Sequence, residues 1–186
     1  MPTLMRRDQF SDLGDLGASR PQVEFVVDNQ VVAGLANATL SIENSTYEAL
    51  IRRIRVAVAG IYSRRCECKG GFLEPVDWRA REWNRGADFL ANHALLTRSS
   101  GGTLTPANVR EALVGNTALQ FFSDGGYVDN VGGSFGVQVL CHSIDEGGHM
   151  RRHMIGYLFE FVADARTVFE MELEGLHAAL ALMENI

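Results

Sequence analysis

The amino-acid sequence predicts an α/β protein whose two halves differ in the order of their elements. Residues 22–96 follow the pattern strand, helix, strand, helix, whereas residues 117–183 form three successive strands and a helix. Between the halves, residues 97–106 (TRSSGGTLTP) are rich in Ser, Thr and Gly, as expected of a linker. A chain of 186 residues can bury one core, so we expect a single domain over residues 21–186 after a flexible tail at 1–20.

In the first half, short apolar runs alternate with amphipathic repeats. QVEFVVD (22–28) is apolar and β-branched, which predicts a buried strand. Residues 44–61 open with a capping-box pattern, S-x-x-E, and then repeat apolar residues at helical spacing. GFLEPVDW (71–78) is predicted to be a strand at a sheet edge, because Pro75 cannot donate a ladder hydrogen bond. Residues 81–95 (REWNRGADFLANHAL) place Ala and Leu on one side of a second helix.

In the second half, the pattern changes to strands that follow one another. A short helix is expected at 106–113, and then strands at 118–124 and 136–142. The segment between these two strands, GGYVDNVGGSFG, ends on the first residue of the second strand, carries five glycines and is expected to be a turn. A third strand is predicted near 150–162, and an amphipathic helix at 167–183 closes the chain.

Composition narrows the classes of function. The net charge is −6, which argues against gripping nucleic acid by charge alone but leaves room for local Arg clusters or bound metal ions. The sequence has neither an apolar run of membrane-spanning length nor a secretory signal, so we expect an intracellular protein, cytoplasmic or nuclear, without a membrane partner. Cys66, Cys68 and Cys141 lack a second matching pair and are predicted to be reduced thiols rather than zinc ligands.

Four acidic residues occupy positions where a carboxylate is costly. Asp28 and Asp124 end apolar strands, Glu172 begins an apolar helical stripe, and Asp88 lies in the first turns of a helix. Partly desolvated carboxylates repel one another unless a cation is supplied. Four of them brought together would hold hard divalent ions such as Mg²⁺, which take oxygen ligands.

Each of these acids also has a structural interpretation when it is taken alone. Asp88 can interact with a helix dipole, and Asp28 can cap the segment that follows it. Asp124 can be a turn residue before Gly125, and Glu172 can be a solvated helix residue. The choice between the two interpretations therefore depends on whether the acids share a pattern.

Such a pattern exists, because each acid lies in a segment that resembles a motif of the ribonuclease H family, in its retroelement and plant form. LQFFSDGGYVDNVGGSFGVQVL resembles the first hairpin, which puts the first catalytic aspartate on Asp124. ELEGLHAAL resembles the first-helix motif and puts the catalytic glutamate on Glu172. VEFVVDNQVV resembles the fourth strand with Asp28 as the third acid, and RAREWNRGADFLANHAL resembles the last helix with Asp88 as the fourth.

The motifs are out of the family's order. The family order would be Asp124, Glu172, Asp28, Asp88, whereas this chain begins with Asp28 and Asp88. The resemblance therefore implies a circular permutation, which proteins tolerate when breaks fall in exposed loops. The usual C-terminal half would be residues 21–96, the connector 97–116 and the usual N-terminal half 117–186. The implied fold is a ribonuclease H-like five-stranded mixed sheet, in the order 3-2-1-4-5, flanked by helices.

The resemblance also implies a function. The chain would be a phosphodiester hydrolase, an endonuclease that cleaves the RNA strand of RNA–DNA hybrids, with retrotransposons as one source of relatives. All four acids would act as catalytic metal ligands for two ions, Mg²⁺ or alternatively Mn²⁺, that activate water and stabilise the leaving oxygen. The expected assembly is a monomer, with a dimer that exchanges its halves as the alternative.

Residues near the acids are candidates for substrate binding. Contacts to 2′-hydroxyl groups in the minor groove are expected from Gly125, Gly126, Asn130 and Asn29. On the helix at 44–61, Arg52, Arg53 and Arg55 lie off the apolar stripe and are candidates for phosphate contacts or a solvated helix face.

Two other functions remain open on the sequence. The first is a non-catalytic scaffold or interaction domain, since a fold does not fix a function. The second is a nuclease of the same fold that acts on another nucleic acid, such as a DNA junction. Cleavage assays on a panel of substrates discriminate among the three.

Overall fold

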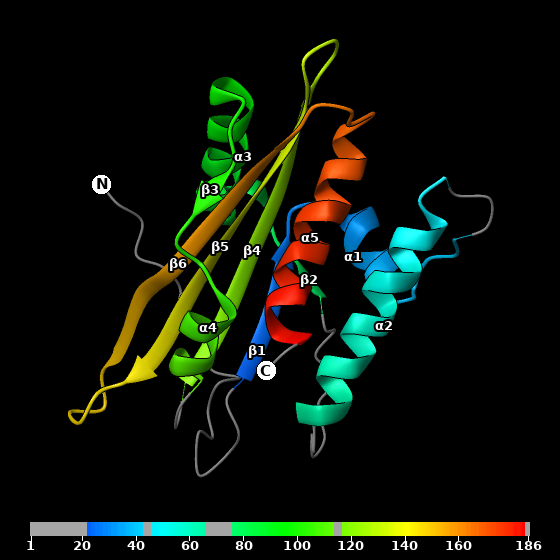
Figure 1. Ribbon diagram of the computed structural model, residues 1–186. Coiled ribbons are helices and arrows are strands. Elements are labelled where there is room, and N and C mark those ends of the chain that lie inside the picture. Colours follow the sequence, from blue (N-terminus) through cyan, green and yellow to red (C-terminus); the bar gives the residue numbers. More distant parts are fainter. Residues whose placement is uncertain (1–21, 43–45, 66–75, 114–116, 185–186) are drawn as a thin grey trace.

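The computed structural model describes residues 22–42, 46–65, 76–113 and 117–184 (Figure 1). A mixed six-stranded sheet lies at its centre, in the order β2-β1-β4-β5-β6-β3. The strands are β1 (Gln22–Val27), β2 (Val76–Trp78), β3 (Gly101–Gly102), β4 (Thr117–Val128), β5 (Gly132–Ile144) and β6 (Met150–Val162). β1 pairs in parallel with β2 and β4, and the remaining pairs are antiparallel. The predicted α/β class with a mixed sheet is therefore confirmed.

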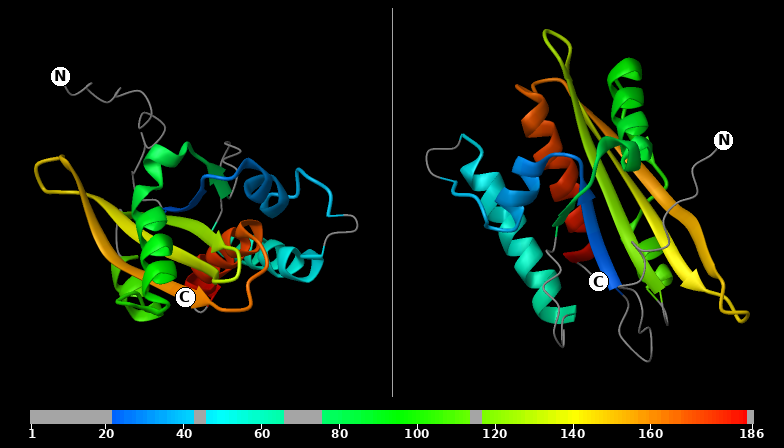
Figure 2. Two further views of the ribbon diagram at one scale, coloured as in Figure 1. Left: turned by 90° about the horizontal axis from the view of Figure 1, so that it is seen from above. Right: turned by 180° about the vertical axis from the view of Figure 1, so that it is seen from behind.

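Helices cover both faces of this sheet (Figures 1 and 2). They are α1 (Gln30–Ala36), α2 (Glu48–Arg65), the 3₁₀ turn η3 (Arg81–Trp83), α3 (Arg85–Thr97), α4 (Pro106–Ala112) and α5 (Val168–Glu184). α5 packs on β4 and β5 from one side, with α2 beside it. α3 crosses β5 and β4 on the other side.

The main core lies between the sheet and α1, α2 and α5. Both predicted apolar stripes face this core. The members with less than a tenth of their surface exposed are Ile51, Ile54, Val58 and Ile61 in α2 and Leu173, Leu176, Ala179, Leu180 and Met183 in α5. Tyr47 and Leu50 of the first stripe are partly buried. Full burial of a Leu or Ile side chain contributes about 1.5–3 kcal/mol. This packing fixes α5, and with it Glu172, against the sheet.

The hairpin formed by β4 and β5 is longer than the sequence predicts. β4 continues through Gly125 and Gly126, and the turn is confined to 129–131, with Asn130 in the left-handed region at φ 61°. The expectation of a long glycine-rich turn is therefore wrong. A Cβ on Gly125 would lie 2.4 Å from the backbone nitrogen of Glu172, and one on Gly136 would lie 2.5 Å from the carbonyl oxygen of Ala87. These glycines lie within strands and let α5 and α3 approach the sheet.

The predicted linker contributes a sixth strand. Gly101 and Gly102 pair with β6, and the backbone nitrogens of Thr103 and Leu104 donate to the carbonyl oxygen of Tyr157 at 2.8 and 3.0 Å. Leu104 is buried, and Thr105 caps α4. The predicted count of five strands and the full order 3-2-1-4-5 are therefore wrong, because this segment extends the sheet beyond β6.

A short helix, α1, is also absent from the sequence prediction. Its N-cap is Asn29, whose side-chain oxygen accepts from the backbone nitrogens of Val31 and Val32 at 2.9 and 3.3 Å. The tail at 1–20, Ser45 of the capping box, Cys66, Cys68 and residues 71–75 of the predicted edge strand lie outside the described residues. No helix in the described ranges combines the length and the apolar character needed to cross a membrane.

Candidate metal centre

Three acidic side chains from separate elements converge at one end of β1. Asp28 directly follows β1, Asp124 lies within β4, and Glu172 lies in the second turn of α5. One carboxylate oxygen from each lies within 4.8 Å of the other two. The parallel pairing of β1 with β4, in which Val26 is opposite Phe122, brings Asp28 beside Asp124 as the sequence predicts.

Asp124 is the most deeply buried of these acids, with 5 % of its surface exposed. Burial, and then the charge of Asp28, raises the pKa of Asp124 to about 8. The backbone nitrogen of Gly125 donates to Asp124 Oδ1 at 2.9 Å and opposes that rise. Without a cation, this carboxyl group is therefore mostly protonated at neutral pH.

Glu172 and Asp28 are affected in the same direction. Burial is the main cause that raises the pKa of Glu172 to about 7, against a hydrogen bond from the side chain of Asn29. Burial likewise raises the pKa of Asp28, while the charge of Arg81 lowers it. Glu172 Oε2 is buried and has no hydrogen-bond partner among the described residues. An ionised oxygen in that position requires a ligand.

Asp88, the fourth predicted acid, lies beside this cluster on α3. It is not one of the three whose oxygens converge, but its charge contributes to raising the pKa of both Asp28 and Asp124. Arg81 Nη2 donates to Asp88 Oδ1. The structure therefore brings all four predicted acids into one neighbourhood and gives one of them an internal counter-charge.

A buried asparagine fixes the start of α3 relative to Asp124. Asn84 is fully buried, and its side-chain nitrogen donates to the carbonyl oxygen of Ser123 at 2.8 Å. The carbonyl oxygen of Asn84 in turn accepts from the backbone nitrogen of Asp88 at 3.0 Å. A single residue thus couples the positions of Asp88 and Asp124 through its side chain and its backbone carbonyl.

The donor set of the three converging acids fits a hard divalent cation. Oxygens bound to one Mg²⁺ lie about 2.1 Å from it, so two of them are up to about 4.2 Å apart. The three converging carboxylate oxygens of Asp28, Asp124 and Glu172 lie within 4.8 Å of one another, which is only slightly more. Small rotations of the side chains would bring them to the distance that one ion requires. Three clustered carboxylates, a buried unpartnered oxygen and raised pKa values are together what a cation site produces when no cation balances the charge.

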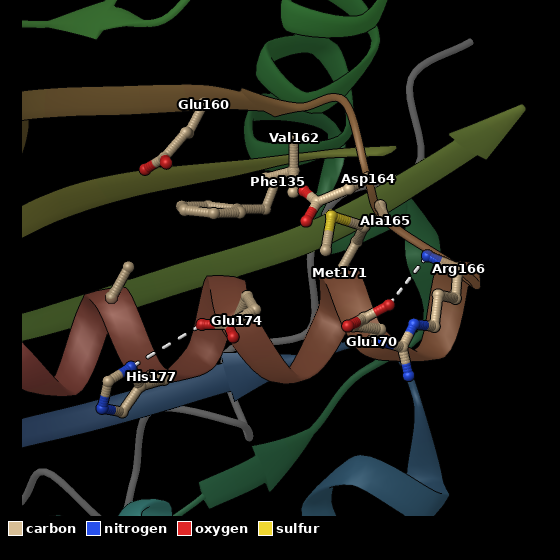
Figure 3. Close-up of a pocket in the computed structure, with 11 residues that line it drawn as sticks. Phe135, Glu160, Val162, Asp164, Ala165, Arg166, Glu170, Met171, Glu174 and His177 are labelled. Atoms are coloured by element: carbon tan, nitrogen blue, oxygen red, sulfur yellow. Dashed lines mark hydrogen bonds and ion pairs between the residues drawn. The ribbon is translucent and has the colours of Figure 1, made fainter. Parts of the chain in front are cut away.

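The structure also distinguishes Glu172 from the two glutamates that flank it on α5. Glu170 and Glu174 line a separate pocket of about 460 Å³ between β6, the segment that follows it and α5 (Figure 3). Glu174 approaches His177 there, and Glu170 accepts from the backbone nitrogen of Arg166. Glu172 is not part of that lining, because it projects toward Asp28 and Asp124.

The structure places the predicted substrate-binding residues at different distances from the acids. Gly125 lies against the backbone of α5, and Asn29 caps α1 while it contacts Glu172. Gly126 lies on the α3 side, near Ser134. Asn130 is at the tip of the β4–β5 hairpin, beyond the end of β4, away from the acids.

The three arginines that the sequence analysis singles out in α2, Arg52, Arg53 and Arg55, interact with other groups of the protein. Arg52 pairs with Glu48 at 2.5 Å on the exposed face of the helix. Arg55 donates to the carbonyl oxygens of Leu35 and Leu40, each at 2.7 Å, and so ties α2 to the end of α1. Arg53 lies close enough to Glu174 to lower the pKa of that acid.

Arg81, Asn84 and Trp78 are parts of the site that the sequence alone does not assign. Trp78 donates from its indole nitrogen to the carbonyl oxygen of Asp28 at 3.0 Å. Arg81 and Asn84 are close to Asp88 in the chain, which is the one sequence signal that could have assigned them to the site. Arg81 lies in a 3₁₀ turn, however, and helical periodicity does not predict where a side chain of such a turn points.

Fold and site together define an α/β protein with a partly buried cluster of carboxylates suited to a divalent cation. Comparisons of the chain with protein-family models, with curated proteins and with solved structures find no significant match.

Proposed function

We propose that this protein is a metal-dependent endonuclease of circularly permuted ribonuclease H-like fold that hydrolyses the RNA strand of RNA–DNA hybrids. The observation that carries the proposal is the convergence of Asp28, Asp124 and Glu172, residues far apart in the chain, within 4.8 Å. Each of the three belongs to a segment that resembles a ribonuclease H motif. A scaffold gains no stability from burying three acids together, because their mutual repulsion and desolvation cost free energy.

The order of the strands in space supports the permuted assignment. When the chain is followed from β4 to α5 and then from β1 to α3, it passes through an antiparallel meander, a helix, a parallel strand, two helices, a second parallel strand and a last helix. In the numbering of the resembled family, β2-β1-β4-β5-β6 are then strands 5-4-1-2-3. β3 is an addition supplied by the segment that joins the two halves.

The four acids would hold two divalent ions between them. Asp28, Asp124 and Glu172 would hold one divalent ion, and Asp88 would complete a second position beside Asp124. Bound Mg²⁺ ions supply Lewis acidity that activates an attacking water and stabilises the leaving 3′-oxygen. Burial of Asp124 and the packing of α5 and α3 fix the ligands before ions arrive, which lowers the cost of ordering them.

Selection of the RNA strand in this proposal depends on its 2′-hydroxyl groups. Asn29 directly follows Asp28, and the backbone of Gly126 lies two residues beyond Asp124, so both lie beside the acids that would hold the scissile phosphate. Polar side chains and backbone groups in such positions distinguish RNA from DNA by hydrogen bonds to the 2′-hydroxyl.

The test is a panel of labelled substrates with Mg²⁺: an RNA–DNA hybrid, duplex RNA, duplex DNA and a four-way DNA junction. We expect cleavage of the RNA strand of the hybrid, no cleavage when EDTA is present, and no cleavage by Asp124→Asn. Cleavage of the junction alone would transfer the proposal to a DNA substrate. A folded protein that cleaves none of them with either Mg²⁺ or Mn²⁺ would contradict catalysis and favour the scaffold.

A further inference from the structure

Arg81 distinguishes Asp88 from the other three acids of the site. Among the described residues, no basic side chain forms a hydrogen bond or ion pair with Asp28, Asp124 or Glu172, whereas Asp88 accepts a hydrogen bond from Arg81 Nη2. The guanidinium charge also reaches beyond that ion pair, because it lowers the pKa of all three converging acids. Arg81 therefore already supplies part of the positive charge that the cluster needs.

The position of Arg81 allows its side chain to move away from Asp88. Its side chain is 72 % exposed, and it belongs to the three-residue turn η3 rather than to the rigid helix α3. In the described part of the chain, Asp88 is the acid that forms an ion pair with it. Ion pairs with such exposure are weak and are screened by salt, so a competing divalent cation can displace the arginine.

We propose that Arg81 is a resident counter-cation that competes with a divalent ion for the Asp88 side of the cluster. The two sides of the site then differ in affinity. The three converging acids accept the first ion without breaking an internal ion pair, whereas Asp88 becomes a ligand for a second ion only when Arg81 withdraws. The withdrawn guanidinium remains at the edge of the site, where its planar set of donors is suited to a phosphate group.

This inference rests on the proposed function only in requiring that the cluster bind divalent ions. Removal of one positive charge about 6 Å from a doubly charged ion changes its binding by about tenfold even at the dielectric constant of water. Replacement of Arg81 by a neutral residue should therefore tighten the second ion by about tenfold. The first ion should change less, because Arg81 is in direct contact with Asp88 and acts on the three converging acids only through its charge.

The experiment is a calorimetric titration of the intact protein with Mn²⁺ alone, without nucleic acid. Arg81→Gln removes the charge, Arg81→Lys keeps it, and Arg85→Gln is the matched control. Arg85 is exposed and close in the chain, but it forms no ion pair with another described residue. We expect two ions in wild type with unequal affinities, an approximately tenfold gain for the second ion in Arg81→Gln, and wild-type behaviour in Arg85→Gln and near-wild-type behaviour in Arg81→Lys. The gain should shrink as NaCl is raised.

Three results would overturn the inference: unchanged Mn²⁺ binding in Arg81→Gln, an equal gain for both ions, or no Mn²⁺ binding by the wild type. Thermal unfolding of each variant verifies that it is folded. Hybrid cleavage is measured separately, so the two proposals can fail independently. A protein that cleaves no hybrid but gains second-ion affinity in Arg81→Gln would retain this inference and lose the proposed function.

Discussion

The proton on Asp124 links the acid cluster to the stability of the fold. The folded pKa of about 8 is far above the ordinary value of 3.8, so the folded protein keeps a proton that the unfolded chain releases. The stability associated with this proton is fully present below pH 3.8 and is lost as the pH rises through about 8. Glu172 acts in the same direction up to a pH of about 7.

His142 has the opposite effect at lower pH. Burial lowers the pKa of His142 to about 4, so its contribution to stability is present above 6.5 and is lost as the pH falls through about 4. Above pH 6.5 the acid cluster can therefore be observed without interference from this histidine.

We predict that the metal-free protein loses stability between pH 6.5 and 8, and that Asp124→Asn reduces this loss. An amide mimics the protonated carboxyl group, so the stability of the variant relative to wild type should increase from pH 6.5 to pH 8. Urea unfolding in EDTA at several pH values measures the difference. Parallel curves for the two proteins would show that Asp124 carries no raised pKa.

Metal uptake should release protons. Because Asp124 and Glu172 have pKa values of about 8 and about 7, an ion that binds at pH 7 must displace protons from them. Calorimetric titration with Mg²⁺ in buffers of different ionisation enthalpy measures the number released. We expect net release at pH 7 that decreases toward pH 9, whereas no buffer dependence at pH 7 would place the ion elsewhere.

At the scale of elements, two glycines control how the acid-bearing helices dock. Gly125 and Gly136 face opposite sides of the sheet, and each is in contact with the backbone of a helix, α5 or α3. A side chain at either position would move Glu172 or Asp88 relative to Asp124. The glycines therefore set the geometry of the cluster although neither binds an ion.

Gly125→Ala should accordingly reduce both stability and activity. The added Cβ would lie 2.4 Å from the backbone nitrogen of Glu172, so α5 must shift, at a cost of about 1–3 kcal/mol. Gly60→Ala is the control, because a Cβ at Gly60 in α2 meets nothing within 4 Å and should stabilise the helix by about 0.5–1 kcal/mol. Chemical unfolding and hybrid cleavage are the measurements. Full activity in Gly125→Ala would show that the position of α5 is not critical.

The same elements explain what the sequence could predict. Apolar spacing identified β1 and the buried sides of α2 and α5, because period and burial agree there. The expectation that Asp28 lies beside Asp124 came instead from the resemblance of their segments to ribonuclease H motifs. Periodicity failed at Gly125 and Gly126, since glycine within a strand has the same local signature as glycine in a turn. The position of β3 depends on tertiary contacts, such as Leu104 against Gly156, that no local pattern contains.

At the scale of the whole molecule, the permuted assignment predicts that the chain can be re-ordered. The suitable opening is between Arg98 and Ser99, because Ser100 Oγ accepts from the backbone nitrogen of Phe161 and must stay with β3. The new chain would run from 99 to 184, through a flexible linker, and then from 22 to 98. Changes in loop length alter stability by only about 1 kcal/mol, within a typical total of about 5–15 kcal/mol.

We expect the re-ordered protein to be folded and to cleave the hybrid with Mg²⁺. Circular dichroism, size-exclusion chromatography and cleavage measure this outcome. If the re-ordered chain does not fold although the natural order does, the two halves are not parts of one rearranged domain.

The proposed function requires that Glu172 belong to the acid cluster, and a second glutamate of α5 provides a matched control. Glu172 lies with Asp28 and Asp124, whereas Glu174, two residues further along the same helix, lines the separate pocket near His177. The measurement is the rate of hybrid cleavage in Mg²⁺ by Glu172→Gln and Glu174→Gln. The assignment of Glu172 as a metal ligand predicts a loss on the order of 10³-fold for Glu172→Gln, because an ion contributes several kcal/mol of transition-state stabilisation, and a rate near wild type for Glu174→Gln. Retained activity in Glu172→Gln, or a comparable loss in Glu174→Gln, would contradict it.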